Sequence, residues 1–198
     1  MKLIAAVTVS LLTATVVFAQ DRARVQNLFE AGKFQEVVEA VPADAAPDVL
    51  YTAAQSHQKL GATDQAAAIY RQLAGRPEDD AWHFIGESAQ ALLEDNTDAA
   101  LDAARRAVEM SGDSPEAQYQ LGLVLAKRQA WREGSAAFDR VAELDPGNAY
   151  AHYYGGLMHY RAGRADRMAI HFEQFLKLAP EAPERPEVLQ IMRTVRGR

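Results

Sequence analysis

The stretch that decides the fold is Tyr119–Gly122, which reads YQLG, because Tyr153–Gly156, YYGG, repeats its layout 34 residues later. The same interval joins an aromatic, an aliphatic and a proline position: Phe138 and Phe172, Leu144 and Leu178, Pro146 and Pro180. A fixed period of about 34 residues is typical of stacked helix–turn–helix units. The sequence therefore predicts a repeat architecture.

Apolar residues recur at helical spacing along the rest of the chain, and Gly, Pro, Asp and Asn mark the breaks. We expect one domain over 20–198 with five helix pairs, at approximately 21–46, 47–78, 79–113, 115–148 and 149–182. The echo weakens toward the N-terminus, where the first pair is clipped and the third is expected to have a longer first helix. A last helix over 187–195 carries one apolar stripe, as expected of a cap on an array.

Residues 1–19 form a segment of their own. Lys2 is followed by an uncharged, mostly apolar run over 3–18, and the small Ala19 precedes two polar residues. This layout predicts a secretory signal peptide that is cut after Ala19. The alternative is an uncleaved anchor, but the run is short for a bilayer span and is diluted by hydroxyl side chains. We expect an exported protein, periplasmic or secreted, with no membrane span after cleavage.

The composition is that of a folded, acidic protein, with 48% hydrophobic residues, 24% charged residues and a formal net charge of −6. An acidic balance argues against non-specific nucleic-acid binding, which cationic surfaces drive. The absence of cysteine excludes disulfides, thiol catalysis and cysteine-ligated zinc. The sequence also has no phosphate-binding loop and no convincing nucleophile–base pair. We therefore expect no enzyme, no cofactor and no nucleic-acid partner.

The units resemble the tetratricopeptide repeat family, whose first helix follows Trp-x-x-Leu-Gly-x-x-Tyr and whose second carries Ala-x-x-x-Phe before a proline. Trp82 and Gly86 follow this pattern in the third unit, Gly122 does so in the fourth and Gly156 in the fifth, where His159 stands at the Tyr position. The resemblance implies an all-α, right-handed solenoid of about five antiparallel helix pairs and a C-terminal capping helix. The small residue lets paired helices approach closely while large residues fill the space beside it.

In this family the first helices line a concave groove, so the resemblance implies a non-enzymatic scaffold that binds another protein. One groove position can be followed through four units and holds Tyr51, His83, Tyr119 and Tyr153. The neighbouring groove positions are expected to hold Gln55, Lys59, Glu87, Gln90, Leu123, Lys127, Leu157, Tyr160 and Arg161. Aromatic rings with polar groups give a large contact area at low entropic cost. We expect alanine at Tyr119 and Tyr153 to leave the fold intact and to abolish binding.

Two other functions stay open. One is a structural component of an envelope or secretion assembly, in which the outer face matters too. The other is a small-ligand or metal-binding protein, because His152, His159 and His171 crowd the fifth unit. His152 and His159 are seven residues apart, about two helical turns, which is too far to share one ion. From this spacing we expect no metal site.

Overall fold

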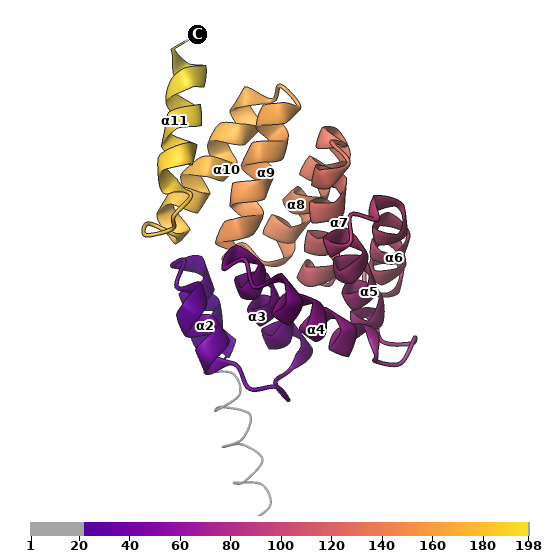
Figure 1. The fold of residues 1–198 in the computed structure, drawn as a ribbon. Helices are drawn as coiled ribbons and strands as arrows, with labels where there is room; N and C mark the ends of the chain where they lie inside the picture. Colours follow the sequence, from indigo (N-terminus) through magenta and orange to yellow (C-terminus); the bar gives the residue numbers. More distant parts are fainter. Residues whose placement is uncertain (1–21, 198) are drawn as a thin grey trace, which may run out of the picture.

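The computed structural model describes residues 22–197, and every regular element in that range is a helix. A helix over 22–30 is followed by α2 (Phe34–Ala40), α3 (Pro47–Lys59), α4 (Thr63–Ala74), α5 (Ala81–Leu93), α6 (Thr97–Met110), α7 (Pro115–Lys127), α8 (Trp131–Leu144), α9 (Ala149–Arg161), α10 (Ala165–Leu178) and α11 (Arg185–Arg196) (Figure 1). Consecutive helices pack against each other in pairs. The prediction of an all-α array of helix pairs is confirmed, whereas the predicted signal peptide lies outside the described residues.

The 34-residue interval runs through four of the pairs without a change. Their first helices are all 13 residues long and begin at Pro47, Ala81, Pro115 and Ala149. The expectation of a longer first helix in the third pair is wrong, because the side chain of Asp80 accepts a hydrogen bond from the backbone N–H of Trp82 and caps α5 there. The backbone thus keeps a period that the side chains only partly show.

The turn inside each of these pairs also repeats. One residue in each turn has a left-handed backbone: Gly61 (φ 74°), Asp95 (φ 61°), Gln129 (φ 59°) and Gly163 (φ 73°). This conformation crowds a side chain's Cβ, so glycine adopts it most easily. Asp95 and Gln129 adopt it nonetheless, which indicates that the packing of the two flanking helices fixes the turn.

Each pair is packed closely at the glycine of its first helix. A Cβ on Gly122 would lie 2.7 Å from the ring of Phe138, and one on Gly156 would lie 2.4 Å from the ring of Phe172. Both rings are completely buried. The two phenylalanines of the echo therefore fill the space that the two glycines leave, as the family pattern implies.

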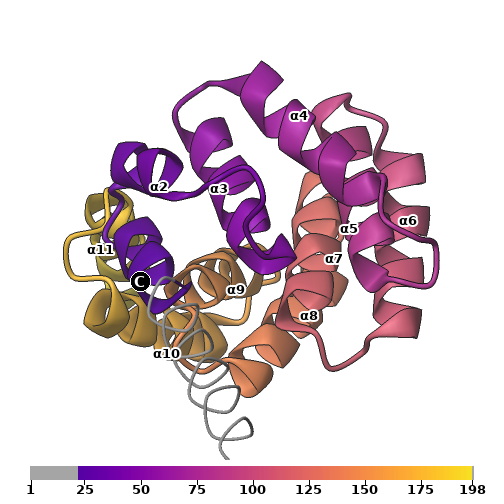
Figure 2. The ribbon, with the colours of Figure 1, turned by 90° about the horizontal axis from the view of Figure 1, so that it is seen from below.

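The array curls until its first helices meet its last ones, so that the helices form a ring around α3 and α9 (Figure 2). The ring centroids of Phe29 and Tyr150 are 4.9 Å apart. Gly32 packs so closely on Pro183 that a Cβ on residue 32 would lie 2.5 Å from Cδ of the proline. These contacts join the first pair to the fifth pair and to the segment before α11, and they enclose part of the inner face.

Candidate functional site

The structure buries most of the tyrosine row that the sequence places on an open groove. Tyr51, Tyr119 and Tyr153 are only 3%, 6% and 7% exposed, and His83 is partly buried. The expected exposure of the three tyrosines is therefore wrong. The curl of the array is the physical reason, because it packs the inner face with side chains of the chain itself.

Tyr119 and Tyr153 have partners inside the molecule. The ring of Tyr119 meets the ring of Phe138 edge-on at 5.5 Å, and the hydroxyl of Tyr153 donates to Glu187 of α11 at 2.9 Å. Truncation of a buried aromatic side chain to alanine costs about 3–5 kcal/mol of stability. Contrary to the expectation from sequence, alanine at these two positions therefore tests stability more than binding.

Tyr51 begins a buried chain of hydrogen bonds that crosses three pairs. Its hydroxyl donates to Oε1 of Gln120 at 2.7 Å, Nε2 of Gln120 donates to Oγ of Ser88 at 3.1 Å, and Ser88 donates to the carbonyl of Ala100 at 2.8 Å. Burial raises the pKa of Tyr51 well above its usual value, so the hydroxyl keeps its proton. The chain of bonds holds α3, α5, α6 and α7 in register.

The remaining expected groove residues are spread over the inner face rather than gathered in one place. Lys59 binds Glu184 at 2.7 Å, Lys127 binds Asp95 at 2.8 Å, Gln90 binds Glu94 at 3.0 Å, Glu87 lies 3.4 Å from His83, and Arg161 lies 5.9 Å from the centroid of the Trp131 ring. Gln55, Leu123, Leu157 and Tyr160 are partly buried.

A cleft of about 440 Å³ opens on the inner face between the helix over 22–30, α3, α7 and α9. Tyr51, Gln55 and Tyr119 of the expected groove line this cleft. The other lining residues are Arg22, Val25, Gln26, Phe29, Asp48, Val49, Thr52, Pro115, Glu116, Leu144, Asp145, Asn148 and Tyr150. The structure therefore brings part of the predicted row together, with partners that the repeat pattern does not indicate.

Carboxylates dominate the charge of the cleft. Asp48, Glu116 and Asp145 line it, and Arg22 is the cation among its lining residues. The side chain of Arg22 is hydrogen-bonded to Asp48, and this bond raises the pKa of Arg22. The side chain of Arg22 is 64% exposed and that of Asp48 is 13% exposed. The cleft thus combines aromatic rings, an acidic lining and one displaceable cation.

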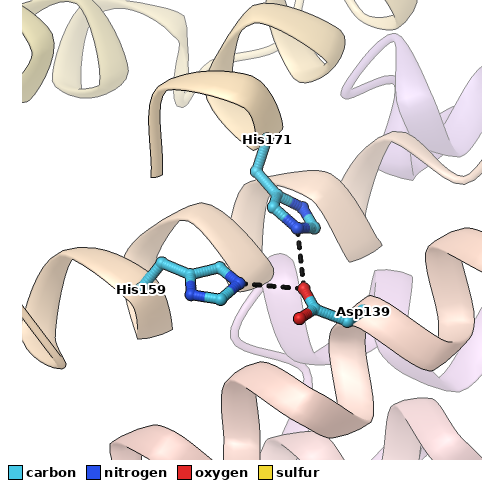
Figure 3. Close-up of side chains that lie close together, drawn as sticks. All are labelled: Asp139, His159 and His171. Atoms are coloured by element: carbon cyan, nitrogen blue, oxygen red, sulfur yellow. Dashed lines mark hydrogen bonds and ion pairs between the residues drawn. The ribbon is translucent and has the colours of Figure 1, made fainter. Parts of the chain in front are cut away.

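A second group of polar side chains meets between the fourth and fifth pairs (Figure 3). Oδ1 of Asp139, on α8, lies 2.9 Å from Nε2 of His159 on α9 and 2.8 Å from Nε2 of His171 on α10. His159 is 0% exposed and His171 is 6% exposed. Burial alone would raise the pKa of Asp139, but its contacts with the two imidazoles outweigh this and hold it well below its usual range.

Reasoning from the sequence missed Asp139 because it compared histidines along one helix only. A signal was present. Asp139 follows Phe138 and His171 precedes Phe172, and these phenylalanines are equivalent positions of the repeat. The second helices of neighbouring pairs therefore carry the two polar residues toward the same first helix, α9, where His159 lies between them.

Two segments of the chain, residues 48–78 and residues 119–183, match family models of the tetratricopeptide repeat. The chain belongs to the tetratricopeptide repeat family. The matched segments cover α3 and α4 and nearly all of α7 to α10, while α5 and α6 keep the same period between them. No curated protein sequence matches the chain.

Solved structures with a similar fold are also tetratricopeptide repeat proteins. One from Thermus thermophilus has a TM-score of 0.59 at 18% sequence identity, over 80% of this chain and 87% of that one. The first such domain of Spaghetti (RPAP3), bound to an HSP90 peptide, has a TM-score of 0.55 at 12% identity, over 61% of this chain and 98% of that one. YrrB, described as having an unusual peptide-binding site, has a TM-score of 0.52 at 19% identity, over 96% and 88%. These likenesses establish the fold.

None of the described helices of this tetratricopeptide repeat protein has the length and apolar character that a membrane crossing requires. The longest described helices have 14 residues.

Proposed function

We propose that this tetratricopeptide repeat protein is an exported, non-enzymatic interaction module of the cell envelope that binds a segment of another protein in the inner cleft. The observation that carries the proposal is the cleft of about 440 Å³ where α3, α7 and α9 converge, lined by tyrosines and carboxylates. Repeat arrays act mainly by presenting extended binding surfaces. Structures of similar fold that are described as peptide-bound or peptide-binding support a binding role.

The chemistry of the cleft favours a basic segment of the partner. Asp48, Glu116 and Asp145 place three carboxylates there against the single guanidinium of Arg22. A lysine or arginine side chain gains from opposite charge and from contact with aromatic rings. Because the side chain of Arg22 is 64% exposed, a cation of the partner can compete with it for Asp48 without disturbing the core.

The envelope location rests on the first 19 residues, whose charged start, apolar run and small Ala19 have the layout of a secretory signal. Mass spectrometry of the protein recovered from the envelope fraction tests it directly. We expect the chain to begin at Gln20. A chain that keeps its first residues and stays in the cytoplasm contradicts export.

Site-specific photo-crosslinking tests the cleft. A benzophenone side chain replaces Gln55, which lines the cleft, and a matched control replaces Asp102, which is exposed on α6. We expect the probe at residue 55 to capture a discrete partner in intact cells, with much weaker capture from residue 102. Capture from residue 102 alone refutes the cleft and favours a structural component that binds through its outer face.

Neutral variants test the charge preference. In one variant Glu116→Gln and Asp145→Asn remove two charges while keeping the shapes of the side chains, and in the control Asp102→Asn and Glu109→Gln do the same on α6. Loss of complementary charge weakens association and its salt dependence. We expect the cleft variant to bind the captured partner about tenfold more weakly. Equal binding by the two variants contradicts the basic-segment proposal.

A further inference from the structure

The fifth pair departs from the family pattern at positions that meet in space. His159 stands where the pattern has Tyr, and Gly155 stands where it has Leu. A Cβ on residue 155 would lie 2.7 Å from Nδ1 and 2.8 Å from Cε1 of His171. Gly155 therefore leaves the room on α9 that the imidazole of His171 fills. The substitution at one position of the pattern makes space for the polar group beside another.

The polar atoms of this group converge on one point, as Figure 3 shows for Asp139, His159 and His171. One ligand atom from each side chain lies within 4.8 Å of the other two. Both imidazoles are buried, and the carboxylate is 29% exposed. The convergence therefore lies inside the protein with one side toward solvent.

The positions of the ring protons require a positive charge at the centre of the group. Nε2 of His152 lies 3.3 Å from the carbonyl oxygen of Pro146, which can only accept, so this nitrogen carries a proton. In the neutral form of His152 its Nδ1 is then an acceptor, and Nδ1 of His171, 3.3 Å away, donates to it.

The lone pair of Nε2 of His171 consequently faces the carboxylate oxygen of Asp139 at 2.8 Å. Two electron-rich atoms stay this close only when a cation lies between them, either a second proton on the imidazole or a metal ion. A hydrogen bond from the other ring nitrogen, which His152 receives here, is also what orients a histidine that binds a metal.

We infer that Asp139, His159 and His171 form a binding site for one divalent transition-metal ion of the Zn²⁺ type, which joins α8, α9 and α10. Imidazole nitrogen and carboxylate oxygen are suitable ligands for such ions. Bonds of about 2.1 Å in a tetrahedral site separate neighbouring ligand atoms by about 3.3 Å. The present separations of 2.8 and 2.9 Å need to widen by only a few tenths of an ångström, which small side-chain rotations supply.

This ligand set leaves a fourth position open. Since the carboxylate of Asp139 is the exposed member of the group, a water molecule would complete the coordination on that side. The ion would tie the fourth pair to the fifth and brace the end of the array. The inference is independent of the inner cleft, whose lining residues include none of the three ligands.

Zinc titration of the full chain, purified without a polyhistidine tag and stripped with EDTA, tests the site. We expect one Zn²⁺ per chain by calorimetry, and a rise in Tm of about 5–10 °C when free Zn²⁺ exceeds Kd a hundredfold. Co²⁺ in the same site should give the visible absorption of a tetrahedral centre. Absence of stoichiometric binding to the wild-type chain overturns the inference.

Two variants and a control assign the ligands. Asp139→Asn preserves the shape of the carboxylate without its charge, and His171→Asn removes one imidazole; we expect each to weaken Zn²⁺ binding at least about tenfold. His83→Gln removes the partly exposed histidine beside Glu87 and should leave binding unchanged. Circular dichroism of the metal-free variants checks that they are folded. Unchanged binding in both folded ligand variants, or loss of binding in the His83 variant, refutes the assignment.

Discussion

Gly86 offers the sharpest test of how closely the helix pairs are packed. A Cβ on this residue would lie 2.4 Å from the backbone nitrogen of Ala74, 2.8 Å from Cβ of Leu73 and 2.8 Å from the carbonyl oxygen of Tyr70. All three atoms belong to the backbone of α4 or are attached to it, so no side-chain rotation relieves the contact. The substitution Gly86→Ala has to move α4 away from α5 by about 1 Å to restore ordinary van der Waals distances.

The expected magnitude is a balance of two effects. Overpacking of a well-filled interior costs about 1–3 kcal/mol, and a contact with immobile backbone belongs at the upper end of that range. Alanine in place of glycine inside a helix returns about 1 kcal/mol. We therefore expect Gly86→Ala to lower the free energy of unfolding by about 2 kcal/mol, and to lower Tm by about 4–8 °C for a chain of this length.

Gly134 provides the matched control, because it is also a glycine inside a helix that faces a neighbouring helix. The nearest atom to a Cβ on Gly134 is Sδ of Met158, at 3.3 Å, and a methionine side chain adapts easily. The helical preference for alanine should prevail, so we expect Gly134→Ala to keep or raise Tm. Thermal unfolding followed by circular dichroism measures both. Equal shifts of the same sign, or a Gly86 variant as stable as wild type, would refute the packing argument.

Three further predictions concern the turns, the polar core and the closure of the ring. Gln129→Gly should raise the free energy of unfolding in urea by about 1 kcal/mol, because residue 129 is left-handed. Tyr51→Phe should lower it by about 1–3 kcal/mol, since the buried Oε1 of Gln120 loses its donor; an unchanged midpoint contradicts the hydrogen-bond chain. Lys59→Met should speed amide exchange in α11 a few-fold at low salt, because Glu184 loses its cation; equal exchange rates in both proteins contradict this role.

The helix pairs could be predicted from sequence because their determinants are local. Gly122 with Phe138, and Gly156 with Phe172, lie 16 residues apart in the chain, within a single pair. One repeat therefore contains all the information for its own packing. The third pair was harder to read, since its side chains follow the pattern less well, although the N-cap Asp80 fixes the start of α5 at the same interval.

The closure of the ring could not be predicted in this way. It depends on contacts such as Phe29 with Tyr150 and Lys59 with Glu184, which join residues more than a hundred positions apart. No period relates these residues. They meet because a small rotation from each pair to the next accumulates along the array, and a repeat pattern specifies that rotation only coarsely.

The group around Asp139 lies between these two cases. His159 and His171 are close in the chain and were noticed, but the acidic member comes from the preceding pair, where an exposed-looking acid on a helix carries no signal of its own. The equivalence of Phe138 and Phe172 was the usable clue, because it aligns the second helices of adjacent pairs. Interfaces between pairs, more than pairs themselves, are thus where a repeat sequence conceals its polar sites.

The burial of the tyrosine row changes what an inner-face tyrosine indicates in such an array. A tyrosine suits an open binding groove and a closed polar core equally well, since its ring packs and its hydroxyl finds a partner in either. Tyr51 and Tyr153 satisfy their hydroxyls within the chain, through Gln120 and Glu187. Recognition by this protein is therefore expected to depend on the charged residues at the rim of the cleft, while the tyrosines hold the ring that shapes it.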